Sequence, residues 1–323
     1  MVRAWIRNSP MLAVRGRFTP FVASCPAKRT RRMPPTPMDH PLAAVADRLS
    51  HGLRRRIAGA LPGALRRGEL TLQYQPRIRL RDGARIASEA LLRWHHTEHG
   101  EIPPTAFIPL AEGSDLIVAI GGWVLRQAAA DARAWPHLGR VSVNISARQL
   151  PGGILAAQVA EALQSSGLPP ERLELELTET LALPEDAATI AMLRGLRDQG
   201  IGLALDDFGT GYAGFGPLRR LPLSTVKLDR SLVAPLPGEP GDIALLRGIR
   251  DTARALGLRL VAEGVERPEQ RDALAALEFE EGQGFLFGRP APLPPLAPPA
   301  GNPTLAAACH HLESPSLAPA LPA

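Results

Sequence analysis

The chain has 323 residues, of which 45% are hydrophobic, so it can bury one large core of about 250 residues or two smaller ones. Its formal net charge is +5, but residues 1–38 carry eight Lys or Arg and no acid, which leaves −3 for residues 39–323. The basic charge therefore belongs to an N-terminal arm, and no nucleic-acid partner is expected for the rest of the chain.

Both ends of the chain are predicted to be largely disordered. Residues 1–62 form a basic arm that runs into a short helix, and its apolar runs are too short for a signal peptide or a membrane span. Residues 293–323 are rich in Pro and Ala and have no apolar period. Cys25 and Cys309 lie one in each end, so no disulfide is indicated. We expect a cytoplasmic protein with no integral membrane segment.

Residues 63–292 alternate strand-like and helical runs. Strands are predicted at 70–77, 86–92, 141–145, 172–178, 202–206, 225–229, 258–263 and 279–285. Helices are predicted at 117–134, 155–166, 186–199, 242–256 and 267–277. About eight strands with helices between them favour an α/β fold of the TIM type, a closed (β/α)8 barrel. No helix separates the first two strands, so the barrel is modified and its first strand is antiparallel.

Polar residues gather where these strands end. They are Asn144, Glu176, Glu179, Asp206, Asp207, Lys227, Asp229, Glu263 and Glu266. An acid at one strand end is usually a helix cap or a turn former. Five strands that end in this way predict an active site, because barrel active sites lie at the carboxyl ends of strands.

So many carboxylates in one place would raise each other's pKa values unless a cation lies between them. Carboxylates and an Asn carbonyl, without Cys or His, form an oxygen-ligand set that suits Mg²⁺ or Mn²⁺. The tandem Asp206 and Asp207 suggest two ions, an arrangement typical of displacement at phosphorus. Lys227 would then lie near the phosphate or the water; the alternative for Lys227 is a salt bridge to one of the acids.

The strand "LELELT" at 173–178 shows how depth in the barrel separates roles. A period of two predicts that Leu173, Leu175 and Leu177 face the helices while Glu174 and Glu176 point inward. Glu176, two residues further along the strand, is expected to lie near the barrel mouth. Glu174 lies lower and is interpreted as a polar residue of a core layer.

A run of short motifs spans this region. Glu89-Ala90-Leu91 stands in "SEALLRWHH" and is followed in order by "FIPLAE", "VNIS", "ELTET", "DDFGTGY", "KLDRSLV", "AEGVE" and "QGFLFGRP". These motifs resemble those of the EAL-domain cyclic di-GMP phosphodiesterases. The resemblance runs from about Leu70 to Pro290. It implies hydrolysis of cyclic di-GMP to linear 5′-pGpG and thus removal of a bacterial second messenger.

The resemblance also implies a role for each matched residue. It implies that two Mg²⁺ or Mn²⁺ ions are bound, with five residues as their ligands: Glu89, Asn144, Glu176, Asp206 and Asp207. It implies catalytic roles for Glu263 as base, Lys227 beside it and Glu179 as the anchor of the loop after Asp207. It implies substrate contacts for Gln75, Leu91, Arg93, Asp229, Glu266 and Gln283. A homodimer is expected.

Departures from the family pattern leave a second function open. Ala213 and Gly214 stand where the family has two serines after "DDFGTGY", and Asp115 and Ser88 replace usual glycines. None of these changes removes a proposed ligand. The alternative is a catalytically weak EAL domain that binds cyclic di-GMP and signals through a partner. A metal-dependent barrel of another chemistry, such as enolate formation, would explain the acids but not the full run of motifs.

Overall fold

The computed structural model describes residues 51–178, 186–210 and 214–294, with side chains described from residue 55 onward. The strands in this part are β1 (Leu70–Arg79), β2 (Arg85–His96), β3 (Gly100–Ile102), β4 (Arg140–Asn144), β5 (Leu173–Thr178), β6 (Gly202–Phe208), β7 (Thr225–Leu228), β8 (Arg259–Ala262) and β9 (Glu281–Gln283). The helices are α2 (His51–Ala64), α3 (Pro104–Glu112), α4 (Leu116–Ala134), α5 (Ile154–Ser166), α6 (Ala187–Asp198), α7 (Gly216–Arg220), α8 (Arg230–Val233), α9 (Pro240–Ala255) and α10 (Pro268–Ala276).

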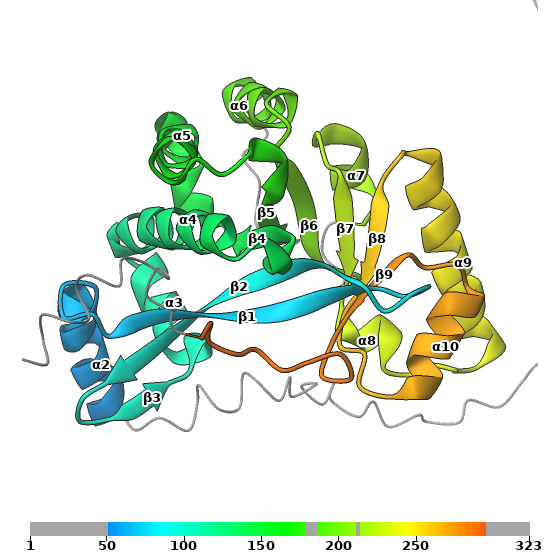
Figure 1. Cartoon of the computed structure of the whole chain (residues 1–323), viewed down its shortest axis with the longest axis horizontal. Helices are drawn as coiled ribbons and strands as arrows, with labels where there is room; N and C mark the ends of the chain where they lie inside the picture. Colours follow the sequence, from blue (N-terminus) through cyan, green and yellow to red (C-terminus); the bar gives the residue numbers. More distant parts are fainter. Residues whose placement is uncertain (1–50, 179–185, 211–213, 295–323) are drawn as a thin grey trace, which may run out of the picture. The chain divides into compact units, whose positions relative to one another are not determined.

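Eight of the nine described strands close into a barrel, because β1 pairs with both β2 and β9. The strands from β4 to β9 are parallel to one another and to β2, whereas β1 is antiparallel to both of its neighbours. Helices α4, α5, α6, α9 and α10 lie outside the strands (Figure 1). The prediction of a modified TIM-type barrel with an antiparallel first strand is confirmed.

All five predicted helices are present, and each boundary agrees within two residues. The short elements α3, α7, α8 and β3 were not predicted. In α3, Pro104 occupies the first turn and Pro109 lies inside the helix, and prolines at this density weaken the helical signal of a sequence. Sequence periodicity is too weak a signal for helices of four or five residues such as α7 and α8.

Helix α2 spans the predicted boundary between the arm and the barrel. This helix ends at Ala64, and its Ile57 and Leu61 are buried in the core, so the predicted division between residues 62 and 63 lies inside it. The division of the chain into arm, barrel and tail stays a prediction. The disorder predicted for the arm up to residue 50 and for the tail from residue 295 lies outside the described residues, as do Cys25 and Cys309.

Local caps fix where the crossover helices begin. The Asp186 carboxylate accepts hydrogen bonds from the backbone N–H and the hydroxyl of Thr189, at 2.8 and 2.9 Å, and α6 starts at the next residue. Helix α9 starts with Pro240 at its first position, and Asp242 accepts from the backbone N–H of Glu239 at 3.0 Å. These caps set the directions in which the chain returns to the barrel.

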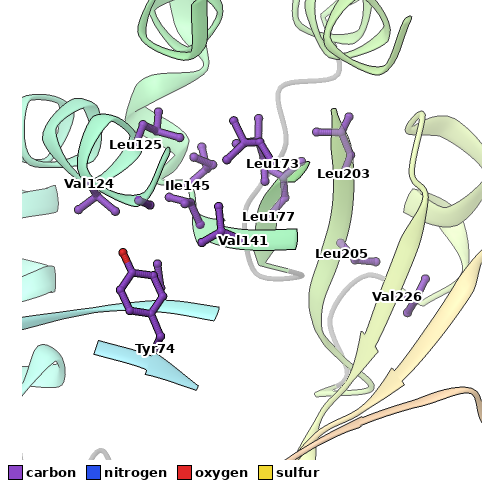
Figure 2. Close-up of a cluster of buried hydrophobic side chains, with 14 of the residues drawn as sticks. Tyr74, Val124, Leu125, Val141, Ile145, Leu173, Leu177, Leu203, Leu205 and Val226 are labelled. Carbon is purple, nitrogen blue, oxygen red and sulfur yellow. The ribbon is translucent and has the colours of Figure 1, made fainter. Parts of the chain in front are cut away.

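The hydrophobic core lies between the barrel wall and the helices. Leu173, Leu175 and Leu177 are fully buried and face outward from β5, as predicted. Figure 2 shows Leu173 and Leu177 in one cluster with Leu203 of β6 and Val124 of α4. Leucine on every second position therefore packs the wall, while the intervening positions are free to carry polar groups into the barrel.

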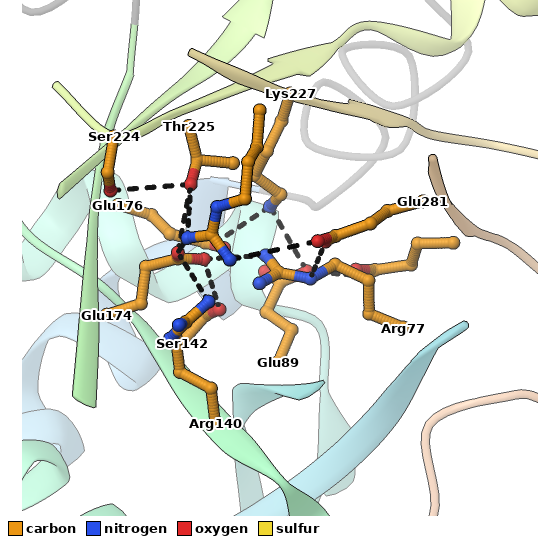
Figure 3. A network of polar contacts seen from close by, with 12 residues as sticks. Arg77, Glu89, Arg140, Ser142, Glu174, Glu176, Ser224, Thr225, Lys227 and Glu281 are labelled. Atoms are coloured by element: carbon orange, nitrogen blue, oxygen red, sulfur yellow. Dashed lines mark hydrogen bonds and ion pairs between the residues drawn. The ribbon is translucent and has the colours of Figure 1, made fainter. Parts of the chain in front are cut away.

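The barrel interior contains a lower layer of charged residues around Glu174. Its carboxylate accepts hydrogen bonds from Arg77 at 2.6 Å, Thr225 and Arg259 at 3.1 Å and Ser142 at 3.2 Å (Figure 3). Burial alone would raise the pKa of Glu174, but the nearby arginines, Arg77 foremost, hold this pKa at about 2. The interpretation of Glu174 as a polar residue of a core layer is confirmed.

Among the described helices, none by itself combines the length and the apolar character that a membrane span requires. Helices α3 and α4, which meet at an angle of 120°, satisfy these criteria only as a pair.

Candidate active site

Six of the nine polar residues predicted at the strand ends meet at one end of the barrel, two residues above the Glu174 layer, together with Gln75, Glu89 and Gln283. All eight barrel strands contribute to this cluster, through Gln75 (β1), Glu89 (β2), Asn144 (β4), Glu176 (β5), Asp206 and Asp207 (β6), Lys227 (β7), Glu263 directly after β8, and Gln283 (β9). The inward positions of β5, β7 and β9 carry paired layers, since Glu174, Thr225 and Glu281 precede Glu176, Lys227 and Gln283 by two residues.

Lys227 is at the centre of the cluster, with a side chain that is 1% exposed. Its Nζ lies 2.8 Å from Glu263 Oε1, 2.9 Å from Glu176 Oε2, 3.2 Å from Asp206 Oδ1 and 3.4 Å from Glu89 Oε2. Lys227 therefore forms ion pairs with four acids from four strands, and it orients each carboxylate toward the same point.

Two amide side chains, Asn144 and Gln283, hold Glu89, the acid of the Glu-Ala-Leu motif, and Gln75 in turn binds Gln283. Asn144 Nδ2 donates to Glu89 Oε1 at 2.9 Å, and Gln283 Nε2 donates to Glu89 Oε2 at 2.6 Å. Gln283 Nε2 also lies 3.2 Å from Gln75 Oε1, whose own amide donates to the backbone carbonyl of Gly288 at 3.2 Å. Both oxygens of Glu89 are thus fixed before any ligand arrives.

A backbone irregularity brings two consecutive aspartates to the same site. Strict alternation along β6 would send Asp206 inward and Asp207 outward. The pairing of β6 with β7 shifts register between Leu205 and Phe208, and Asp207 has a left-handed φ of 58°. As a result, carboxylate oxygens of Asp206, Asp207 and Glu263 lie within 4.8 Å of one another.

Burial and mutual repulsion separate the pKa values of the acids. Burial, followed by the charge of Asp206, raises the pKa of Glu263 to about 8, and burial followed by Asp206 and Asp229 raises that of Asp207 to about 6. Burial also raises the pKa of Glu176 well above its usual range, although Lys227 opposes this.

Glu89 and Lys227 shift in the directions that favour their charged forms. Burial opposes the ionised form of Glu89, but Lys227 and the hydrogen bonds from Gln283 and Asn144 outweigh it and lower its pKa. Burial likewise opposes the ammonium of Lys227, yet the surrounding acids, Asp206 and Glu176 first, raise its pKa well above the usual value.

The cluster fits divalent cations. Two groups of carboxylates, Glu89–Glu176–Asp206 and Asp206–Asp207–Glu263, share Asp206, and each brings its oxygens within 4.8 Å. Five carboxylates and one ammonium carry a formal charge of −4, which two divalent ions would balance. Glu176 Oε1 is buried and has no hydrogen-bond partner among the described residues, although such an atom normally has one. A hard cation is the partner that this oxygen set suits.

Two cavities border the cluster. The smaller, of about 240 Å³, is lined by Gln75, Glu89, Arg230, Glu263, Gly264, Glu266, Gln283, Gly284 and Phe285. The larger, of about 640 Å³, reaches Leu91, Arg93 and Asn144 and continues between α3 and α4. Of the predicted substrate contacts, Gln75, Glu266 and Gln283 therefore lie on one side, and Leu91 and Arg93 lie on the other.

Two of the predicted residues, Asp229 and Glu179, are not among the described residues that line the two cavities. Asp229 lines neither cavity; its Oδ1 accepts from the backbone N–H of Ser231 at 2.9 Å and caps α8. Glu179 lies outside the described residues, as does Ala213 of the loop after Asp207.

Two residues of the smaller cavity, Arg230 and Phe285, were not predicted from the sequence. Both stand inside quoted motifs, and Phe285 follows Gln283 by two residues, which is the signal that was available.

The family model of the EAL domain matches residues 58–290. The chain belongs to the EAL domain family. Within this EAL domain, the barrel mouth described above carries the Glu89-Ala90-Leu91 motif on β2. The resemblance that the motifs predicted is confirmed.

Named relatives and a solved structure agree with this assignment. The EAL domain is 42% identical over 233 residues to the bifunctional diguanylate cyclase/cyclic di-GMP phosphodiesterase MucR of Pseudomonas aeruginosa, covering 71% of this chain and 34% of that protein. It is 42% identical over 234 residues to the cyclic di-GMP phosphodiesterase NbdA of the same species, covering 71% and 30%. The solved PaMucR phosphodiesterase in complex with c-di-GMP superposes with a TM-score of 0.68 at 41% identity, covering 73% of this chain and 98% of that one.

The matched region spans about a third of the length of these curated relatives, between 29% and 34% for the first four. The similarity therefore concerns the EAL domain and not the remainder of those proteins.

Proposed function

We propose that this EAL domain hydrolyses cyclic di-GMP to linear 5′-pGpG and so lowers the level of a bacterial second messenger. The observation that carries the proposal is the buried cluster of five acids around Lys227, in which Glu176 Oε1 has no partner among the described residues. The names of MucR and NbdA, and the c-di-GMP in the PaMucR complex, support the choice of substrate.

Glu89, Asn144, Glu176, Asp206 and Asp207 would hold two Mg²⁺ or Mn²⁺ ions. Their carboxylate and amide oxygens match the ligand preference of these ions. Bound ions would stabilise negative charge on the phosphoryl oxygens during in-line displacement.

Glu263 is proposed to accept the proton of the attacking water. Its pKa of about 8 lies near neutral pH, and a pKa near the working pH is what a group needs in order both to gain and to lose a proton. The water oxygen forms a bond to phosphorus while the P–O3′ bond breaks, and the 3′ oxygen takes up a proton from solvent, which leaves the phosphate on the 5′ carbon. Lys227, 2.8 Å from Glu263 Oε1, would keep that carboxylate aimed at the water.

The remaining proposed contacts fall on both sides of the acids. Gln75, Glu266 and Gln283 would bind one half of the dinucleotide in the smaller cavity, while Leu91 and Arg93 would bind the other half. Arg93 supplies a guanidinium for a phosphate. Asp229, whose charge raises the pKa of Asp207, is proposed to contact the substrate beside it. Glu179 is proposed to anchor the loop after Asp207.

A second function, binding of cyclic di-GMP without cleavage, is favoured by the residues that follow "DDFGTGY". Gly214 has a left-handed φ of 55° and no side chain to pack, at a position where the family usually has serine. A loop that holds the second ion weakly would leave binding intact and lower turnover.

Chromatography of the product separates the two functions. The full chain should convert cyclic di-GMP to pGpG with Mg²⁺ or Mn²⁺, and the addition of EDTA should stop this conversion. The Glu263→Ala variant should form no pGpG. Cyclic di-GMP that binds but stays intact with either metal would refute hydrolysis and favour the signalling function. The proposed homodimer is tested separately by light scattering of the full chain.

A further inference from the structure

Arg230 is a charged side chain of the site to which no function has been given so far. Among the nine described residues that line the 240 Å³ cavity, it is the single cation, and three others, Glu89, Glu263 and Glu266, carry carboxylates. Its side chain is 62% exposed, and its Nη1 lies 3.3 Å from Glu266 Oε1. Exposed ion pairs of this kind contribute little to folding, so stability does not explain the placement.

The backbone around Arg230 directs its guanidinium to the cavity. Arg230 is the first residue of α8, directly after the cap residue Asp229. Its aliphatic stem packs on Gly264, which directly follows Glu263. A Cβ on Gly264 would lie only 2.5 Å from Arg230 Cγ, and Gly264 has a left-handed φ of +66°. The absence of a side chain at residue 264 therefore leaves room for the arginine beside the proposed base.

The pair of Arg230 and Glu266 matches one edge of a guanine base. Guanine presents acceptors at N7 and O6 and, next to them, donors at N1–H and the 2-amino group; arginine binds the first two with two parallel hydrogen bonds. The carboxylate of Glu266, beside the arginine, can accept hydrogen bonds from the two donors, N1–H and the 2-amino group. Adenine also accepts at N7, but it has an amino donor where guanine has O6 and an acceptor where guanine has N1–H, so the arginine would lose one hydrogen bond and the carboxylate would face an acceptor.

An aromatic ring completes this arrangement. Phe285 lines the same cavity and is 47% exposed, which is unusual for a large apolar side chain. Its ring is held by the guanidinium of Arg289, 4.1 Å from the ring centroid. Exposed aromatic rings in nucleotide sites stack on bases, so Phe285 supplies affinity while the polar pair supplies selectivity.

We propose that Arg230 determines the specificity of this site by binding O6 and N7 of one guanine of the substrate, beside Glu266. This inference rests on the proposed function, because it requires a guanine dinucleotide in the smaller cavity. Arg230 touches the base and not the scissile phosphate, so its removal acts on the choice of nucleotide more than on the chemical step.

The test compares the dissociation constants of cyclic di-GMP and cyclic di-AMP. They are measured with the full chain and Mg²⁺ in a Glu263→Gln background, where the proposed mechanism allows no turnover. Arg230→Met keeps the length of the side chain without its charge, and Arg230→Lys keeps the charge without the paired donors. Both variants should reduce the preference for cyclic di-GMP about tenfold or more. The control Arg271→Met removes an exposed arginine of α10 that pairs with its neighbour Asp272, and it should leave the preference within twofold.

The outcomes separate this inference from the proposed function. The inference would be overturned if Arg230→Met kept the wild-type ratio of the two dissociation constants. It would also be overturned if Arg230→Lys kept this ratio, because a positive charge without the paired donors would then be sufficient. A wild-type chain that binds cyclic di-GMP but does not cleave it would refute hydrolysis, and the ratio of dissociation constants would still decide the role of Arg230.

Discussion

Lys227 Nζ and Glu263 Oε1 lie 2.8 Å apart inside the barrel, and this contact joins the central cation of the cluster to its proposed base. The same ammonium also pairs with Glu176, Asp206 and Glu89. The salt-bridge and catalytic interpretations of Lys227 are therefore compatible, because one position serves both.

Replacing Lys227 by Met should abolish most of the activity without unfolding the protein. Methionine fills a similar volume, but the four acids lose their shared cation and Glu263 loses its orientation. We expect the rate of pGpG formation to fall about 100-fold or more. Product chromatography measures the rate, and circular dichroism checks the fold. A rate within threefold of wild type would remove Lys227 from the mechanism.

Glu174 and Glu176 should respond in opposite ways to the same change. Glu174 is ionised and paired with Arg77, so Glu174→Gln leaves a buried arginine short of its partner and should cost about 3–5 kcal/mol of unfolding free energy. Burial raises the pKa of Glu176 well above its usual range, and Lys227 keeps three other acidic partners when Glu176 is replaced, so Glu176→Gln should change stability in EDTA by less than about 1 kcal/mol.

Urea unfolding in EDTA, paired with product assays, checks this contrast. Glu176→Gln should lose activity while it keeps its stability. Equal stability losses for the two variants would show that depth in the barrel does not separate their roles.

The stability of the metal-free protein should depend on pH through Glu263. Its pKa is about 8 in the folded protein and near 4.5 when unfolded, so between these values the folded state binds more protons. Stability in EDTA should therefore fall as pH rises from 5 to 8. The acids with lowered pKa values, Glu89 and Glu174, stay ionised in both states at the upper end of this range and do not reverse the trend.

Urea midpoints at several pH values measure this slope, and Glu263→Gln should make it shallower without removing it, because Glu176 and Asp207 also have raised pKa values. Titration calorimetry in two buffers gives a second measurement, since Mg²⁺ binding at pH 7 should release protons. Metal binding without proton release would contradict the raised pKa of Glu263.

A pH dependence of the opposite sign is expected from Glu69, far from the acid cluster. Its carboxylate accepts from Arg67 Nε at 2.7 Å and from the Trp94 indole at 2.9 Å, and these bonds, Arg67 first, lower its pKa to about 2. The stability that it adds is complete above about pH 4.5 and is lost as pH falls toward 2. Glu69→Gln should thus be less stable than wild type at pH 7, and the difference should shrink at pH 2.5 in urea midpoints.

Periodicity in the sequence predicted the barrel and its strand-end acids because both depend on local patterns. The leucines on alternate positions of β5 face the helices and are buried there. Because side chains alternate between the two faces of a strand, Glu174 and Glu176 must then point into the barrel. The partners of Glu174 could not be predicted in this way. Arg77 and Arg259 come from strands 97 and 85 residues away in sequence, and only the register of the closed sheet brings them together.

Backbone geometry explains how Asp207, which the sequence predicted at the site, reaches it, and why Arg230 was not predicted. The left-handed φ of Asp207 turns a residue that alternation would send outward toward the site, and no pattern of residue types encodes that bulge. Arg230 resembles an ordinary solvated arginine after "KLD". Its relation to the cavity depends on Gly264, which lies on the neighbouring strand connection.

The central claim is that the acid cluster around Lys227 is the metal centre that cleaves cyclic di-GMP. X-ray diffraction at a wavelength with strong anomalous scattering from manganese, on crystals of the full chain grown with Mn²⁺ and cyclic di-GMP, tests it most directly. We predict two manganese peaks that share the Asp206 carboxylate, with Glu176 Oε1 as a ligand to one of them. Bound nucleotide with no manganese at Glu89, Glu176, Asp206 or Asp207 would contradict the claim.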